Sequence, residues 1–343
     1  MANLKSLAKD TAIYGLSSIA ARFIGYLLVP IETVKFNAAG GQYGIITNIY
    51  AYVALLIILL TYGMETTFFR FMNRQGEDAE KVYATTLRLV ATTSVLFIAL
   101  VALFLHPIAD GIGYPDHPEF IMIMGACVAI DAFINIPLAY LRYAHRPVKF
   151  VSIRLISIVV NIVGVLLYLV VFPYFKINFL GLYDENFSLH VVYVFWIELA
   201  GSVITLFFLG KELKGFRFPF DKATCKRMLN YTWPLLIMGL AGQLNQTASQ
   251  IIFPWMYNGN AQEARMELGI YGACIKLAMI MVIITQAFRY AYEPFVFGKT
   301  KDKDNKETYA KAMKFYIIFT LLAFLSVMAY MDILRYIVGK SYW

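Results

Sequence analysis

The 343-residue chain is 60% hydrophobic and only 15% charged, with a mean hydropathy of +0.63. A water-soluble domain carries about 45–50% apolar and about 25% charged residues, so this composition excludes an ordinary soluble protein and predicts one that faces lipid. The net charge of +8 does not indicate nucleic acid binding, because the basic residues lie in alternate connections between apolar stretches, as membrane orientation demands.

Nine apolar stretches are long enough to cross a hydrocarbon core, which takes roughly 20 residues of helix. They predict an all-α polytopic membrane protein with spans at 11–31, 44–64, 84–105, 119–141, 150–173, 189–210, 229–253, 269–292 and 313–332. The first span contains Arg22 and lacks a small-residue cleavage site. We therefore interpret it as a retained helix and not as a signal peptide.

The distribution of Lys and Arg predicts the orientation of these spans. With the N-terminus in the cytoplasm, 22 of the 30 basic residues lie on the cytoplasmic side and 5 on the other side. The positive-inside rule therefore favours a cytoplasmic N-terminus. The cysteines Cys127, Cys225 and Cys274 are scattered, so the sequence predicts neither a metal site nor a disulfide framework, and nothing in it requires a cofactor.

A weak internal repeat has an offset of roughly 225 residues. Tyr43-Gly44-Ile45 opens the second span as Leu268-Gly269-Ile270 opens the eighth. The pattern predicts that spans 7–9 repeat spans 1–3 in the same direction, as in some transporters; chance similarity among apolar helices is the alternative. It divides the chain into a six-helix lobe at 1–212 and a partial second lobe at 213–343, and we expect a complete version to contain at least three more spans.

The N-terminal part carries a recognisable series of motifs. They are KDTAIYGLSS at 9–18, RFIGYLLVP at 22–30, QYG at 42–44, TYGMET at 61–66 and FFRF at 68–71. The series resembles the polysaccharide biosynthesis proteins (Wzx-type O-antigen flippases) of the MOP superfamily, which are relatives of the MATE exporters and of the lipid II flippase. The likeness is closest to versions from Bacteroidetes.

This resemblance implies a MATE-like bundle of two six-helix lobes that form a V around a central cavity. It implies alternating access and an undecaprenyl-diphosphate-linked oligosaccharide as cargo. It also implies a place in the bacterial inner membrane, where the protein serves lipopolysaccharide, O-antigen or capsule synthesis beside other polysaccharide-assembly proteins.

A cavity for such a cargo needs cations for the diphosphate and hydrogen-bonding groups for the sugar, because an uncompensated charge cannot be buried. Arg22 lies near the middle of the first span and shares a face with Tyr14 and Ser18. We expect this face to line the cavity; an ion pair between Arg22 and Asp131 is the alternative. Lys276 is a second candidate for the phosphate, or a side chain that extends toward the headgroups.

Amides and carboxylates within the spans suggest two further roles. Gln243, Gln246 and Gln250 form a polar face in the seventh span that can bind sugar hydroxyls or join helices. Asp131, Asn135 and Glu198 lie deep in spans 4 and 6. They are candidates for coupling transport to H⁺ or Na⁺, or for a structural role.

A possible gate lies at the cytoplasmic end of the second span. Glu65 and Arg70 close this end and can form a gate or an ordinary surface ion pair.

The leading interpretation is a flippase without covalent chemistry. The first alternative is a MATE-type exporter of small molecules, driven by H⁺ or Na⁺; the cations Arg22 and Lys276 favour an anionic lipid instead. A membrane glycosyltransferase or polymerase would need catalytic groups in a sizeable surface loop, whereas the outer connections have at most about 15 residues and hold no glycine-rich phosphate loop. A nonfunctional, shortened remnant is the last alternative.

Overall fold

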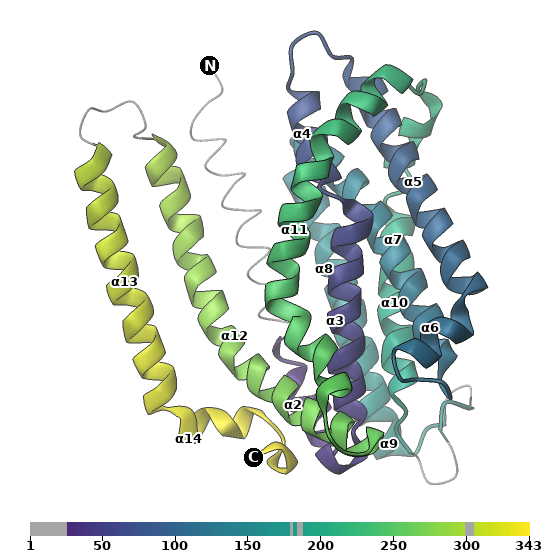
Figure 1. Ribbon diagram of the computed structural model, residues 1–343, viewed down its shortest axis with the longest axis vertical. Helices are drawn as coiled ribbons and strands as arrows, with labels where there is room; N and C mark the ends of the chain where they lie inside the picture. The colour runs from purple at the N-terminus through teal and green to yellow at the C-terminus, as the bar shows by residue number, and fades with distance from the viewer. Residues whose placement is uncertain (1–25, 179–180, 184–187, 299–304) are drawn as a thin grey trace.

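The computed structural model describes residues 26–178, 181–183, 188–298 and 305–343, and these residues contain helices and no strands (Figure 1). The α-helices are α2 (Val29–Lys35), α3 (Gln42–Thr61), α4 (Met64–Met72), α5 (Ala79–Leu103), α6 (Leu105–Gly111), α7 (Pro118–Tyr143), α8 (Pro147–Leu166), α9 (Phe172–Phe175), α10 (Val191–Phe208), α11 (Lys222–Met256), α12 (Ala261–Gly298), α13 (Asn305–Ala329) and α14 (Met331–Leu334). Short turns of other helix types lie at η1 (Ala38–Gly40), η2 (Leu167–Val171), η4 (Glu212–Arg217), η5 (Arg335–Ile337) and η6 (Lys340–Tyr342).

Five helical segments are long and apolar enough to cross a membrane, namely Gln42–Met72, Ala79–Leu103, Pro118–Tyr143, Pro147–Phe175 and Val191–Phe208. They coincide with five of the predicted spans. A sixth candidate, Met313–Ala329, bends by 62° into Met331–Ile337. The predicted spans at 229–253 and 269–292 lie on the long helices α11 and α12, which do not meet the same criterion over the described residues. The count of nine therefore stays a prediction.

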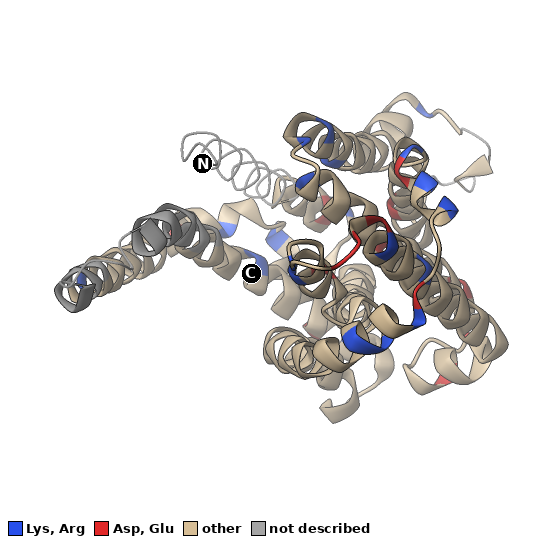
Figure 2. Cartoon of the chain, turned by 90° about the horizontal axis from the view of Figure 1, so that it is seen from above, with Lys and Arg blue, Asp and Glu red and all other residues tan. Residues whose placement is uncertain are grey.

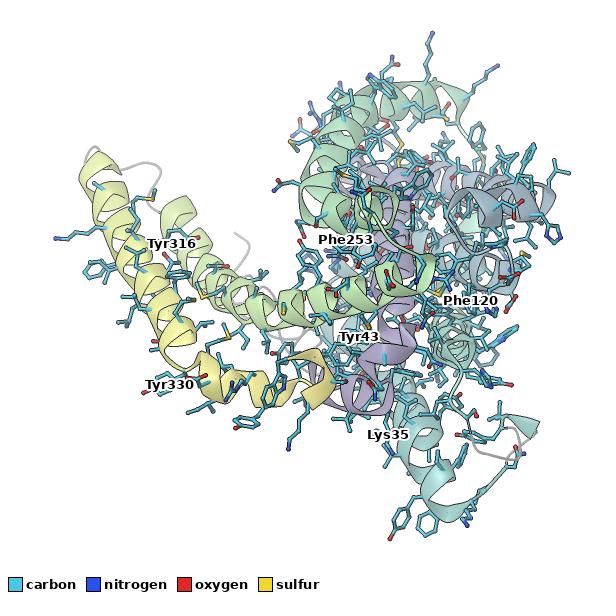
Figure 3. The ribbon with its side chains drawn as sticks, turned by 60° about the horizontal axis from the view of Figure 1, so that its bottom comes forward. Lys35, Tyr43, Phe120, Phe253, Tyr316 and Tyr330 are labelled. Atoms are coloured by element: carbon cyan, nitrogen blue, oxygen red, sulfur yellow. The ribbon has the colours of Figure 1, made fainter. Side chains whose placement is uncertain are left out.

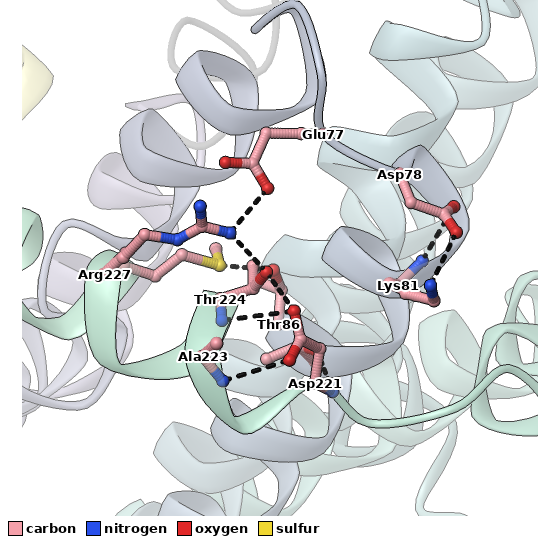
Figure 4. A network of polar contacts seen from close by, with 10 residues as sticks. Glu77, Asp78, Lys81, Thr86, Asp221, Ala223, Thr224 and Arg227 are labelled. Carbon is pink, nitrogen blue, oxygen red and sulfur yellow. Dashed lines mark hydrogen bonds and ion pairs between the residues drawn. The ribbon is translucent and has the colours of Figure 1, made fainter.

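Local sequence explains where several helices begin and end. Tyr62 and Gly63 both adopt positive φ, 36° and 71°, and separate α3 from α4 inside one apolar segment. At the start of α11, the Asp221 carboxylate accepts hydrogen bonds from the backbone N–H groups of Ala223 and Thr224 (Figure 4). The Thr224 hydroxyl donates to the same carboxylate and lowers the pKa of Asp221. The cap is thus in its charged, accepting form at neutral pH.

The helices α3, α5, α7, α8, α10 and α11 pack side by side as one bundle, which we call the first bundle (Figure 1). Its interior contains many apolar and aromatic side chains. Phe195 is fully buried and meets the rings of Tyr50 and Phe120 edge-on, with centroids at 6.1 Å and 5.4 Å. In a membrane, where lipid is as apolar as the helix surface, the close packing of such rings contributes to helix association through van der Waals contacts.

Helices α12 and α13 leave this bundle. We call the end of the molecule with α2, η1 and α14 the α14 end, and the opposite end, with the α4–α5 connection, the α4 end. Helix α12 lies against α3 at the α14 end and diverges from the bundle toward the α4 end (Figure 1). Figure 3, which brings the α14 end forward, shows α14 and the last residues returning from α13 toward the bundle near Tyr43.

The last residues dock on the segment between α2 and α3. Tyr342 is 4% exposed and donates its hydroxyl to the carbonyl oxygen of Phe36 at 2.5 Å. The Gly339 N–H donates to the Thr33 hydroxyl at 3.0 Å, and the Ala38 N–H donates to Ser341 at 3.2 Å. These bonds fasten the region after α13 to the first part of the chain at the α14 end.

Candidate functional site

The centre of the first bundle contains a carboxylate with donors from two neighbouring helices. Glu198 lies on α10, and its Oε2 atom accepts a hydrogen bond from the Asn161 side-chain amide on α8. The Tyr50 hydroxyl on α3 is a second, longer donor at 3.5 Å. An ionisable group held this way within apolar helices is a functional candidate by default. The prediction that Glu198 lies deep in the bundle agrees with its surroundings.

A second carboxylate, Glu32, links Glu198 to a lysine from another part of the chain. Glu32 on α2 interacts electrostatically with Glu198 and with Lys276 on α12. Lys276 is half-buried, and its charge is opposite to that of both carboxylates. The structure thus places Lys276 at an acidic group that joins the first bundle to α12.

Asp131 forms a neighbouring polar group on α7. The Cys127 thiol lies 3.8 Å from the Asp131 carboxylate and 3.4 Å from the Ser202 hydroxyl on α10. Arg154 on α8 interacts with Asp131 electrostatically, as does Glu198. Three half-buried carboxylates and the half-buried Lys276 therefore lie between α2, α3, α7, α10 and α12, and the exposed Arg154 on α8 lies at the edge of this group. Asn135, one turn beyond Asp131 on the same helix, is half-buried.

The two residues of the expected gate have other partners. Glu65 on α4 forms an ion pair with Arg142 on α7, and not with Arg70. The Arg70 guanidinium instead lies 4.1 Å from the centre of the Tyr231 ring on α11. Glu65 thus joins α4 to α7, and Arg70 joins α4 to α11. A gate that opens by breaking a Glu65–Arg70 bond is not what the geometry offers.

The predicted glutamine face of α11 is divided by the packing. Gln246 is exposed, whereas Gln243 and Gln250 are half-buried. The backbone oxygen of Gln250 accepts a hydrogen bond from the buried Asn48 side chain on α3 at 2.8 Å. The Asn48 oxygen in turn accepts from the Tyr114 hydroxyl at 3.0 Å. Tyr14, Ser18 and Arg22 lie outside the described residues, so their place in this geometry stays a prediction.

The sequence reasoning missed Glu32, Asn161, Tyr50, Asn48 and Arg142. Asn161 had a readable signal, because it is an amide in the middle of an otherwise apolar span. Glu32 directly follows the first predicted span and was treated as part of a connection. Tyr50 and Asn48 acquire a role only through residues of other helices, which no local pattern reveals.

Helices α3 and α12 cross at Gly44 and Gly269, which occupy corresponding positions in the predicted repeat. A Cβ at Gly44 would overlap the carbonyl oxygen of Arg265, and one at Gly269 would lie 3.0 Å from the Gly44 nitrogen. One turn further along, a Cβ at Gly272 would overlap the Thr47 hydroxyl. Gly44 and Gly269 are 225 residues apart, as are Thr47 and Gly272. Corresponding positions meet in this way when an approximate two-fold axis passes through the crossing, which supports the predicted repeat.

Other contacts reinforce the crossing at the α14 end. Arg265 donates to the Gly113 carbonyl oxygen at 2.9 Å and lies 5.0 Å from the centre of the Tyr114 ring. The Gln262 side chain donates to the Ala39 carbonyl oxygen at 3.1 Å. The molecule is therefore closed at the α14 end.

A pocket of about 560 Å³ lies between α12, α13 and α14, among residues such as Ile280, Phe319 and Leu334. The lining residues that the structure describes include no charged side chain, so they do not suit an anionic headgroup. The polar group around Glu198 and Lys276 is the better candidate for chemistry. In the described residues, no cluster of three or more His, Cys, Asp or Glu side chains can hold a metal ion.

Comparison with solved structures defines the class of protein. A multidrug resistance MATE family transporter of the MOP superfamily matches in its inward-facing conformation, with a TM-score of 0.64 at 15% identity, over 96% of this chain and 73% of that one. The outward-facing conformation matches with a TM-score of 0.61 at 14% identity, over 98% and 76%. A MOP superfamily transporter from Pyrococcus furiosus, noted for the reversed polarity of its binding pocket, matches with 0.54 at 14%, over 100% and 79%. The fold is that of MOP transporters.

The family follows from the sequence match. The model of the polysaccharide biosynthesis protein family covers residues 7–292, so the chain belongs to this family. The resemblance read from the motifs is confirmed, and the chain is a multi-pass membrane protein of the flippase type. No curated protein matches the chain closely enough to name a nearer relative.

Proposed function

We propose that the protein moves an undecaprenyl-diphosphate-linked oligosaccharide across the bacterial inner membrane by alternating access, for lipopolysaccharide, O-antigen or capsule synthesis. The observation that supports this most strongly is the family match over residues 7–292 on a transporter fold. The protein acts as a carrier without covalent chemistry. The division into lobes at 212 and 213 is part of this proposal, although η4 spans that boundary.

The charge distribution supports an orientation. The connections predicted to be cytoplasmic lie at the α4 end (Figure 1), and the view from that end shows Lys and Arg positions, in blue, on several helices and connections (Figure 2). With this end in the cytoplasm and the N-terminus inside, the closed α14 end faces outward. The structure then corresponds to an inward-facing state, ready to take up cargo from the cytoplasmic leaflet.

The acidic group around Lys276 suggests how an ion and the cargo can be linked. While Glu32 and Glu198 are charged, they compete with the diphosphate for Lys276. Binding of H⁺ or Na⁺ at Glu32, Asp131 or Glu198 removes that competition and leaves a cation for the phosphate. Asn135 lies beside Asp131 and completes the proposed coupling site.

The cargo contacts complete the proposal. Arg22 is its second phosphate contact, with Tyr14 and Ser18 on the same face. The sugar contacts are Gln243, Gln246 and Gln250. Glu65 and Arg70 remain the proposed gate residues. Each acts with its own partner, Glu65 with Arg142 and Arg70 with Tyr231.

The second candidate function is a MATE-type exporter of small molecules. The observation that favours it is the group of three interior carboxylates, which suits a cationic drug as well as a coupling ion. The two functions predict opposite effects of neutralising Lys276. Its loss weakens binding of an anionic lipid and leaves binding of an organic cation equal or stronger.

Binding of the purified full chain to undecaprenyl diphosphate, measured by native mass spectrometry, tests this choice. We expect Lys276→Gln to bind less of the lipid diphosphate than the wild type, with Lys314→Gln, an exposed lysine on α13, as the matched control. Unchanged lipid binding by Lys276→Gln, together with saturable binding of an organic cation, would favour the exporter.

A further inference from the structure

The α10–α11 connection, residues 209–221, is fixed to the first bundle through its backbone. The Tyr83 hydroxyl donates to the Glu212 carbonyl oxygen at 2.9 Å, and Arg88 donates to the Phe216 carbonyl oxygen at 2.6 Å. The Asp221 N–H donates to the Thr85 hydroxyl at 3.1 Å. These three bonds all come from side chains of α5, so the connection lies along this helix.

Side chains on the same side of the connection strengthen the attachment. The Glu212 carboxylate is 3% exposed and pairs with Lys149 at 2.6 Å. A Cβ at Gly215 would overlap the ring of Tyr83. The one acidic side chain of η4 is therefore buried and neutralised. It does not offset the charge of the basic residues that lie beside it in the sequence.

The other side of the connection is basic and apolar. Lys211, Lys214 and Arg217 are exposed, and none of them forms an ion pair within the described part of the chain. Phe216 and Phe220 lie among them and are 37% and 44% exposed. The Phe216 ring also stacks on that of Phe133 on α7, with a centroid distance of 6.2 Å. The protein thus holds three cations and the exposed parts of two rings outward on a fixed backbone.

The level of the connection in the membrane follows from the helix before it. The apolar segment of α10 ends at Phe208, directly before the connection. Residues immediately beyond a span lie among the lipid headgroups, where aromatic rings and long basic side chains are both favoured. The surface therefore meets phosphates and the upper part of the acyl chains together.

We propose that the α10–α11 connection is a binding surface for anionic phospholipid headgroups, with Lys211, Lys214 and Arg217 as phosphate contacts and Phe216 and Phe220 as the apolar anchor. Charge complementarity and the exposed rings select a lipid surface as the occupant. The site lies away from the Glu198 group and does not depend on the cargo. It holds the first bundle against the membrane surface while α12 and α13 move.

The test measures how many phosphatidylglycerol molecules the purified full chain retains, compared with phosphatidylcholine, by native mass spectrometry. The variant Lys211→Gln/Lys214→Gln/Arg217→Gln removes the three cations. The variant Lys35→Gln/Lys176→Gln/Lys340→Gln removes the same charge from exposed positions at the other end. Because basic residues near an anionic surface contribute additively, we expect the first variant to lose affinity for phosphatidylglycerol by about a hundredfold, and the second to resemble the wild type.

Three results would overturn the proposal. In the first, the connection variant retains phosphatidylglycerol as well as the wild type does. In the second, both variants lose it equally, which shows a general effect of net charge. In the third, glycerol phosphate displaces the lipid completely, which shows a site for soluble anions. Phe216→Ser/Phe220→Ser supplies a second measurement, since it keeps every charge and should still weaken retention.

Discussion

Glu198 receives hydrogen bonds from Asn161 and Tyr50, so the proposed coupling role can be tested with little change of shape. Glu198→Gln removes the charge and the ability to titrate. We expect the stimulation of transport by an H⁺ or Na⁺ gradient, measured in reconstituted vesicles, to fall about tenfold. This fall corresponds to a loss of about 1.4 kcal/mol of coupling free energy. Glu263→Gln, an exposed glutamate at the start of α12, is the control and should respond like the wild type. A gradient response that survives in Glu198→Gln would remove Glu198 from the coupling site.

The Glu65–Arg142 pair offers a second prediction at the residue scale. Arg142 also lies 5.0 Å and 5.6 Å from the ring centres of Phe69 and Phe150, so its position is constrained on several sides. We expect Glu65→Gln and Arg142→Gln each to lower the melting temperature, and the exchange Glu65→Arg/Arg142→Glu to recover part of the loss. Additive losses with no recovery would show that the two side chains are not energetically coupled.

How far single residues were predictable depends on where their partners lie. Asp131, Glu198 and Lys276 stood out because ionisable residues inside apolar spans are costly and have to serve a purpose. The pairing of Glu65 with Arg142 was not predicted, because it joins residues 77 positions apart whose meeting depends on how α4 packs on α7. Glu32 was missed for the same reason, since its neighbours come from α10 and α12.

The crossing of α3 and α12 gives a prediction for the helix pair. Gly44→Val places a side chain against the backbone of Arg265, and an overpacked contact costs about 1–3 kcal/mol or more. We expect this variant to open the α14 end, so that a cysteine introduced at Thr47 reacts faster with a membrane-impermeant maleimide. Gly242→Ala on α11 is the matched control, because its added Cβ meets no atom within 4 Å. Equal labelling in both variants would show that the crossing does not close this end.

Most helices were predictable because apolar length is a local property. Five spans were located to within a few residues, with the break at Tyr62 and Gly63 as the main local surprise. Helices α11 and α12 were expected as ordinary spans and instead extend over 35 and 38 residues. Their polar ends and faces reflect contacts with other helices and the connections, which hydropathy alone does not encode.

The closed α14 end leads to a prediction for the whole molecule. Ala39 in η1 and Gln262 on α12 are in contact at this end, with a distance of 3.1 Å between the Gln262 amide nitrogen and the Ala39 oxygen. We expect a short bismaleimide to join cysteines at these positions, in a chain whose three native cysteines are replaced, and to stop transport. The single-cysteine variants treated with the same reagent are the controls. Full transport by the cross-linked protein would contradict alternating access through opening of this end.

The arrangement of the whole molecule was predictable from two signals of different strength. The motifs at 9–74 indicated the family, and the family match confirmed it. The repeat was weak in sequence, and it gains support from the direct contact of Gly44 with Gly269 at the crossing. The divergence of α12 and α13 from the bundle had no sequence signal of its own, because one sequence serves both the inward-facing and the outward-facing arrangement of such a transporter.

The most direct test of the central claim is a flipping assay in vesicles that contain the purified protein and a fluorescent undecaprenyl-diphosphate oligosaccharide. A membrane-impermeant quencher reports the labelled lipid in the outer leaflet. We predict that quenching proceeds to nearly all of the label, and that it slows in Lys276→Gln and in the cross-linked Ala39/Gln262 variant. If quenching stops once the labelled lipid that started in the outer leaflet is quenched, as in vesicles without protein, the account is contradicted.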